Sequence, residues 1–148
     1  MSPKHSIEIG YYLSSSRALW RNADMEFNQP FLQLPWRFDS QPLAREVKAL
    51  PQDFWLDHPS GLPGNSAVPL VSVNGEMNHA FDGAMQATRA LRESPYLHQT
   101  VASFGEVVAR SRLMRLAPGA QVAEHVDFNY HWVSRVRIHV PIVTDPSV

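Results

Sequence analysis

Residues 121–144 read QVAEHVDFNYHWVSRVRIHVPIVT, and this stretch decides how the rest of the chain is interpreted. His125 and Asp127 are two positions apart in it. Residues at that spacing in an extended strand point to the same face, so the imidazole and the carboxylate can converge on one point. Arg137 and His139 follow at the same spacing and can line the same wall further along.

A strand is predicted over residues 134–143, because polar and apolar residues alternate there. Its polar positions are Arg135, Arg137 and His139. An alternation of this kind is typical of a strand with one buried face and one face in water. It would equally suit the wall of a pocket that binds an anion, and the spacing alone leaves both interpretations open.

The pair His125 and Asp127 supplies two of the three ligands of a 2-His-1-carboxylate iron(II) site. Such a site keeps positions open for a cosubstrate and for oxygen. A keto acid cosubstrate with two carboxylates would need a fixed cation for the carboxylate that does not reach the metal. The bidentate fork of an arginine suits that role. Taken alone, a His-x-Asp pair is a weak signal, because chance would supply roughly 0.3 such pairs in a chain of this composition.

Composition restricts the class of protein. The chain has 148 residues, 44% of them hydrophobic and 18% charged, which predicts one globular domain over residues 1–148. With 13 basic and 14 acidic residues, no basic field is available for nucleic acid. There is no cysteine, no apolar leader and no long apolar run. We therefore expect a cytoplasmic protein that binds no membrane.

Within that domain, residues 1–66 are predicted to be mixed helix and loop, and residues 67–148 to be mainly strand. The predicted strands cover residues 7–13 (as a possible edge strand), 68–73, 106–116 and 122–127. Pro69 suggests that the second of these is an edge or the start of a strand.

Helices are predicted in three places. The first covers residues 42–50 and has Asp39 or Ser40 as its N-cap. The second begins at Asn78 or Asp82 and continues to about Leu91, and the third begins at Pro95. The loop and helix histidines His58, His79 and His98 are interpreted as surface or hydrogen-bonded residues.

The run of residues 112–144 resembles the aspartyl/asparaginyl β-hydroxylase family of iron(II)- and 2-oxoglutarate-dependent dioxygenases. That family includes bacterial hydroxylases of free proline. The resemblance covers residues 112–148 closely and residues 55–105 more loosely. It rests on a strand, the turn at Pro118 and Gly119, the His125-x-Asp127 motif, and the R-x-R-x-H strand of residues 135–139.

The resemblance implies an α+β, mainly β fold: a double-stranded β-helix (a cupin-like jelly roll) with N-terminal helices packed on it. It implies His125 and Asp127 as ligands of Fe(II), and Arg137 and His139 as contacts for 2-oxoglutarate. Molecular oxygen would be consumed to hydroxylate an aspartyl or asparaginyl side chain, a peptide or a free amino acid. The carboxylate at Asp127 places the chain nearer the bacterial branch.

The chain departs from the family at its C-terminal end. No histidine follows His139, although the family places its distal metal ligand on a later strand. We therefore expect an incomplete barrel, the N-terminal part of a longer enzyme. An open sheet edge after Val143 would favour assembly into a homo-oligomer.

Two other functions remain open. A non-catalytic, cupin-like binding or interaction module would keep an inward-facing pocket but bind no metal tightly. A structural β domain would instead turn Arg135, Arg137 and His139 to solvent. The dioxygenase hypothesis requires His125, Asp127, Arg137 and His139 to face one cavity.

Overall fold

The computed structural model describes residues 3–12, 33–59, 61–105, 108–123 and 135–144. Its strands are β1 (Lys4–Tyr12), β2 (Leu56–Asp57), β3 (Asn65–Val73), β4 (Met85–Ala87), β5 (Val108–Leu116) and β6 (Arg135–Val143). Its helices are α1 (Ser40–Ala49), α2 (Arg89–Arg92) and α3 (Pro95–Ala102), with a short 3-10 helix, η1 (Gln52–Phe54).

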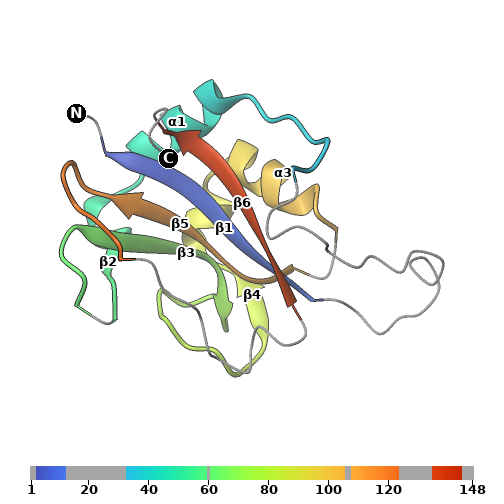
Figure 1. Ribbon diagram of the computed structural model, residues 1–148. Helices are drawn as coiled ribbons and strands as arrows, with labels where there is room; N and C mark the ends of the chain where they lie inside the picture. Colours follow the sequence, from blue (N-terminus) through green and yellow to red (C-terminus); the bar gives the residue numbers. More distant parts are fainter. Residues whose placement is uncertain (1–2, 13–32, 60, 106–107, 124–134, 145–148) are drawn as a thin grey trace.

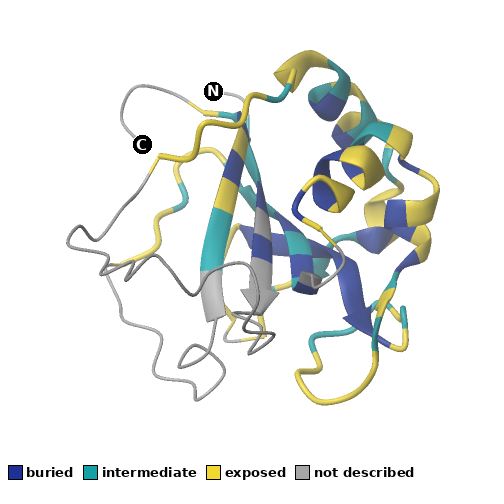
Figure 2. Cartoon of the chain, turned by 90° about the vertical axis from the view of Figure 1, so that its right-hand side faces the viewer, coloured by how far each residue is buried: buried dark blue, intermediate teal, exposed yellow. Residues whose placement is uncertain are grey.

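The strands form one antiparallel sheet in the order β2-β3-β5-β1-β6, and β4 pairs with β3. The helices gather on one side of this sheet (Figure 1, Figure 2). Over the described residues, the fold is thus a mixed α/β arrangement with a mainly antiparallel sheet and three α-helices. Within the described part of the chain, no helix is long and apolar enough to cross a membrane.

The core fills the space between the sheet and the helices. Alternation along β1 and β5 turns Ile7, Ile9 and Leu113 to this side, and all three are fully buried. Leu43 of α1 and Leu97 of α3 reach them from the helices. Burial of a side chain of this size stabilises the fold by about 1.5–3 kcal/mol, so this layer fixes which sheet face is left open.

The N-terminal strand is confirmed, but its predicted place at an edge is wrong. β1 lies between β5 and β6 and pairs with both. Its two partners come from later parts of the chain, and the register pair Lys4–Leu116 is 112 residues apart in sequence. A local pattern reveals a strand but contains no information about such distant neighbours.

Pro69 is likewise in an interior strand, because β3 pairs with β5 on one side and with β2 and β4 on the other. The register with β5 shifts between Pro69 and Val71. Proline cannot donate a backbone hydrogen bond, and a bulge is the place where a sheet tolerates that loss. β3 is therefore not an edge strand, although neither β2 nor β4 pairs with it at Pro69 itself.

The predicted helix from Asn78 or Asp82 to Leu91 is also wrong. Those residues form a loop, the short strand β4, and α2, which has Thr88 as its N-cap. Gly83 has a φ of 142°, and a Cβ there would lie 2.5 Å from Val73 Cγ1. This close approach requires glycine and a non-helical backbone.

The other helices are confirmed. Asp39 caps α1 by accepting a hydrogen bond from the Gln41 amide at 2.9 Å. α3 begins at Pro95, as predicted. The strand predicted over residues 122–127 is wrong at Val122 and Ala123, which are not in a strand; residues 124–127 lie outside the described part.

Candidate functional site

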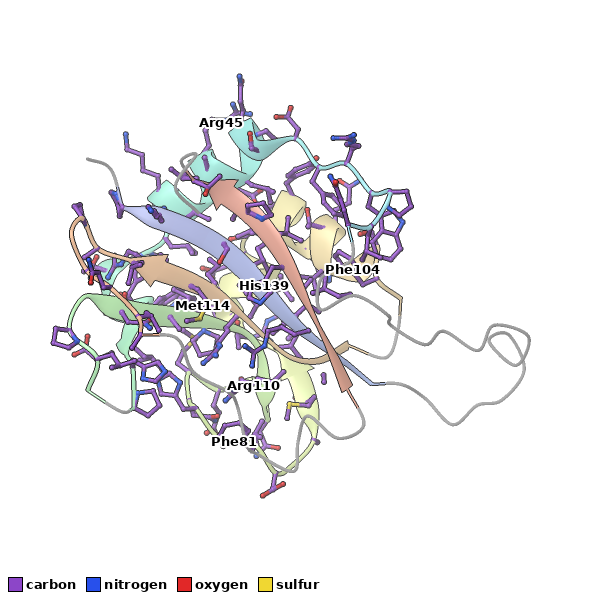
Figure 3. The ribbon with its side chains drawn as sticks, in the orientation of Figure 1. Arg45, Phe81, Phe104, Arg110, Met114 and His139 are labelled. Carbon is purple, nitrogen blue, oxygen red and sulfur yellow. The ribbon has the colours of Figure 1, made fainter. Side chains whose placement is uncertain are left out.

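The face of the sheet opposite the helices carries a row of charged positions. Glu8 of β1 pairs with Arg112 of β5 on one side and with His139 of β6 on the other. Directly opposed residues point to the same face of a sheet. Figure 3 shows His139 with Arg110 and Met114 over the face that the helices leave open. We call this surface the cationic face.

A second row lies next to the first. Gly10 of β1 pairs with Arg137, and the register between β1 and β5 shifts between Ile9 and Tyr11. Arg110 of β5 is two residues from Arg112 and shares its face. Gly10 contributes no side chain to this row, so its charged side chains come from the two strands that flank β1.

Arg110 is held in place by two contacts. Its guanidinium carbon lies 4.1 Å from the centroid of the Phe81 ring, and its Nη1 donates to the His79 carbonyl at 3.2 Å. A cation over an aromatic face is attracted by the negative face of the ring. Arg110 is therefore oriented by the loop before β4.

His79 adjoins the same cations. Its Nε2 lies 3.1 Å from the backbone oxygen of Asp57. A carbonyl oxygen can only accept a hydrogen bond, so Nε2 carries the hydrogen in this contact. Burial lowers the pKa of His79, and the charges of Arg112, Arg110 and His58 lower it further, against the opposing effect of the Asp57 hydrogen bond. The ring is thus protonated less readily beside the arginines than a free imidazole would be.

The structure places two of the sequence-predicted site residues. Arg137 is half-buried, with its Nε atom fully buried, and His139 is exposed. Both lie on the cationic face, as the alternation predicts. His125 and Asp127, the predicted metal ligands, lie outside the described residues, as does the side chain of Arg135.

Three contributors were not assigned to the site from sequence: Arg110, His79 and Phe81. A signal for Arg110 was present, because β5 alternates in the same way as β6. His79 and Phe81 come from a loop about 30 residues earlier, and no local pattern connects them to β5.

In chemical terms the arginines of the cationic face suit a carboxylate, although the acid Glu8 lies in the row between Arg112 and His139. Arginine side chains bind carboxylates through paired, charge-assisted hydrogen bonds. Over the described residues there is no group of three or more histidines and carboxylates that could hold a metal. Comparisons with protein-family models, with curated proteins and with solved structures gave no match.

Proposed function

We propose that this chain is an iron(II)- and 2-oxoglutarate-dependent dioxygenase with a fold of the double-stranded β-helix type. Its substrate would be an aspartyl or asparaginyl side chain, a peptide or a free amino acid. The observation that carries the proposal is that Arg137 and His139 share the sheet face opposite the helices with Arg110 and Arg112.

The described residues fit 2-oxoglutarate. Its distal carboxylate needs a cation fixed in one orientation, and Arg137 has its Nε buried, which restricts how the guanidinium can turn. A half-buried arginine also attracts a carboxylate more strongly than an arginine in water would. His139 lies one row away and can orient a second carboxylate by a hydrogen bond.

His125 and Asp127 would supply two of the three protein ligands of the iron, which supplies the oxygen chemistry when it is bound, and no histidine follows His139 to supply the third. The protein's own contribution is positional. Arg137 and His139 bind and orient the cosubstrate, and the apolar layer beneath β6 keeps water from the other side of the strand. Fixed geometry of this kind lowers the entropic cost of bringing two reactants together.

The second candidate is a binding module that holds a carboxylate on the same face without a metal. It is favoured by the exposure of His139 and by the anchoring of Arg110 on Phe81, neither of which requires iron. The purely structural interpretation is disfavoured, because a solvent-facing arginine does not need a buried Nε.

The test is equilibrium binding of 2-oxoglutarate to the full chain with Mn(II) as a redox-inactive metal. Arg137→Lys keeps the charge but removes the fork, so the Kd should rise by about tenfold to a hundredfold. Arg45→Lys, on the exposed side of α1, is the matched control and should leave the Kd unchanged.

Two measurements distinguish the two candidates: the binding of glutarate and the formation of succinate. A dioxygenase binds glutarate, which lacks the keto oxygen, much more weakly than 2-oxoglutarate, and it forms succinate when Fe(II) and oxygen are supplied. A metal-free binding module holds both diacids equally and forms no succinate. Failure of Arg137→Lys to change the Kd would contradict both.

A further inference from the structure

A separate cavity of about 310 Å³ lies where β2, β3 and β5 meet, at the end of the sheet. We call it the end cavity. Asp57, Asn65, Ser66 and Arg115 are among its lining residues. Its volume is at the lower limit for small-molecule pockets, which restricts any occupant to a small molecule.

The register explains why opposite charges face this cavity. Asp57 of β2 pairs with Ser66 of β3, and Ser66 pairs with Arg115 of β5. Residues paired in this way point to the same face. The acidic and the basic position are therefore two strands apart, roughly 10 Å between backbones, with a serine between them.

The side chain of Arg115 is on the other side of the sheet from the cationic face, and neither Arg137 nor His139 lines the end cavity. Alternation along β5 places Arg115 with Leu113, which is buried beneath the helices, whereas Arg112 points the other way. An occupant of the end cavity would not touch Arg137 or His139. Binding in the end cavity is therefore independent of the proposed dioxygenase activity.

Arg115 is fixed before any ligand arrives. Its guanidinium carbon lies 4.1 Å from the centroid of the Trp55 ring, Nε donates to Ser66 Oγ at 2.9 Å, and Nη1 donates to Gln52 Oε1 at 3.2 Å. Both acceptors are neutral, so its charge is not cancelled by them. A guanidinium has further N–H donors, which remain for a ligand.

Asp57 does not neutralise Arg115 directly. Among the described residues, no ion pair within 4.0 Å joins the two side chains. Burial is the main influence on the pKa of Arg115 and lowers it, while the negative charge of Asp57 raises it. The carboxylate therefore acts on the guanidinium across the cavity and not through contact.

A cavity with a fixed cation on one wall and a carboxylate on another matches a ligand that carries both charges. An anion alone would be repelled by Asp57, and a cation alone by Arg115. We infer that the end cavity binds a small zwitterion of the α-amino acid class, with the ligand carboxylate on Arg115 and its ammonium group toward Asp57.

The test uses the full chain, without iron or 2-oxoglutarate, and glycine as the probe. The backbone amides of Asn65 and Ser66 and the Nε–H of Arg115 are followed by NMR in ¹⁵N-labelled protein. Glycine should shift all three saturably. Acetate and methylammonium, with one charge each, should bind at least about tenfold more weakly.

Asp57→Asn removes the charge that recognises the ammonium group. It should weaken the binding of glycine by about tenfold and should not weaken the binding of acetate. The matched control is Asp53→Asn, an exposed acid on η1 that does not line the cavity, and it should bind glycine as the wild type does. Asp57 is itself exposed, so this variant is expected to fold.

Three results would overturn the inference: no saturable glycine shift, acetate binding as tightly as glycine, or an unchanged glycine affinity in Asp57→Asn. The second result would identify a plain anion site. None of these outcomes bears on iron or 2-oxoglutarate, so failure here is distinguishable from failure of the proposed function.

Discussion

The guanidinium of Arg110 lies over the ring of Phe81, with 4.1 Å between the guanidinium carbon and the ring centroid. The two residues come from β5 and from the loop before β4. Their contact joins that loop to the cationic face and fixes the direction of one of its arginines. The cationic face is thus preorganised by an aromatic residue that contributes no charge.

Phe81→Leu should lower the free energy of unfolding by about 0.5–1 kcal/mol, because leucine keeps apolar area but has no aromatic face. Phe81→Tyr keeps the ring and should lose less than half of that. Urea unfolding of the three proteins measures the difference. Equal losses in both variants would mean that the cation–π contact contributes nothing.

Glu46 of α1 joins two helices. Its two carboxylate oxygens accept hydrogen bonds from the amides of Tyr96 and Leu97 in the first turn of α3, each at 2.8 Å. Glu46→Ala leaves these donors without their acceptor and should cost about 1–3 kcal/mol of unfolding free energy. Glu46→Gln keeps one acceptor oxygen, so its loss should be smaller. An unchanged midpoint in Glu46→Ala would contradict the role of this residue.

Two buried threonines provide a matched comparison. Thr100 Oγ1 makes no hydrogen bond to any described residue, whereas Thr88 Oγ1 donates to the Pro69 carbonyl at 2.8 Å. Thr100→Val should therefore leave the unfolding free energy unchanged or raise it by up to about 1 kcal/mol. Thr88→Val should lower it by about 1–2 kcal/mol, since it also removes the N-cap of α2. A large loss in Thr100→Val would contradict this assignment.

His79 makes stability depend on pH. Burial is the largest cause of its lowered pKa, so the folded protein binds the proton less tightly than the unfolded chain does. The contribution of His79 to the free energy of unfolding is complete above the ordinary pKa of about 6.5, which applies to the unfolded chain. It is lost as the pH falls toward the lower pKa of the folded protein. The pKa of His5 is lowered in the same direction, chiefly by burial and then by Arg115.

His79→Gln should therefore flatten the decline in unfolding free energy below pH ~6.5 without abolishing it, because His5 remains. Urea unfolding at several pH values between neutrality and mild acid provides the measurement. An identical pH dependence in the variant and the wild type would show that His79 does not contribute.

Local signals predicted the elements whose structure is determined locally. The alternation in β6 placed Arg137 and His139 on one face, and the cap at Asp39 located the start of α1. The neighbours of β1 could not be predicted, because strand pairing between distant segments is decided by the whole core. The helix expected up to Leu91 failed for the same reason, since Gly83 must pass close to Val73.

For the candidate site too, the sequence predicted what lies on one strand and not what the tertiary structure brings together. Alternation indicates which side chains of one strand share a face, so the shared face of Arg137 and His139 could be predicted from the sequence. The anchoring of Arg110 on Phe81 and on the His79 carbonyl depends on a loop 31 residues before it. The end cavity joins three strands, and only the register brings Asp57 opposite Ser66 and Ser66 opposite Arg115.

The most direct test of the central claim is an anaerobic titration of the full chain with Fe(II) and then 2-oxoglutarate. The metal-to-ligand absorption band of the ternary complex is the signal. The proposed dioxygenase gives a band that is lost in His125→Ala and in Asp127→Ala and kept in His98→Ala, a change at an exposed position on α3. A wild-type protein that gives no band with both compounds present would contradict the proposal.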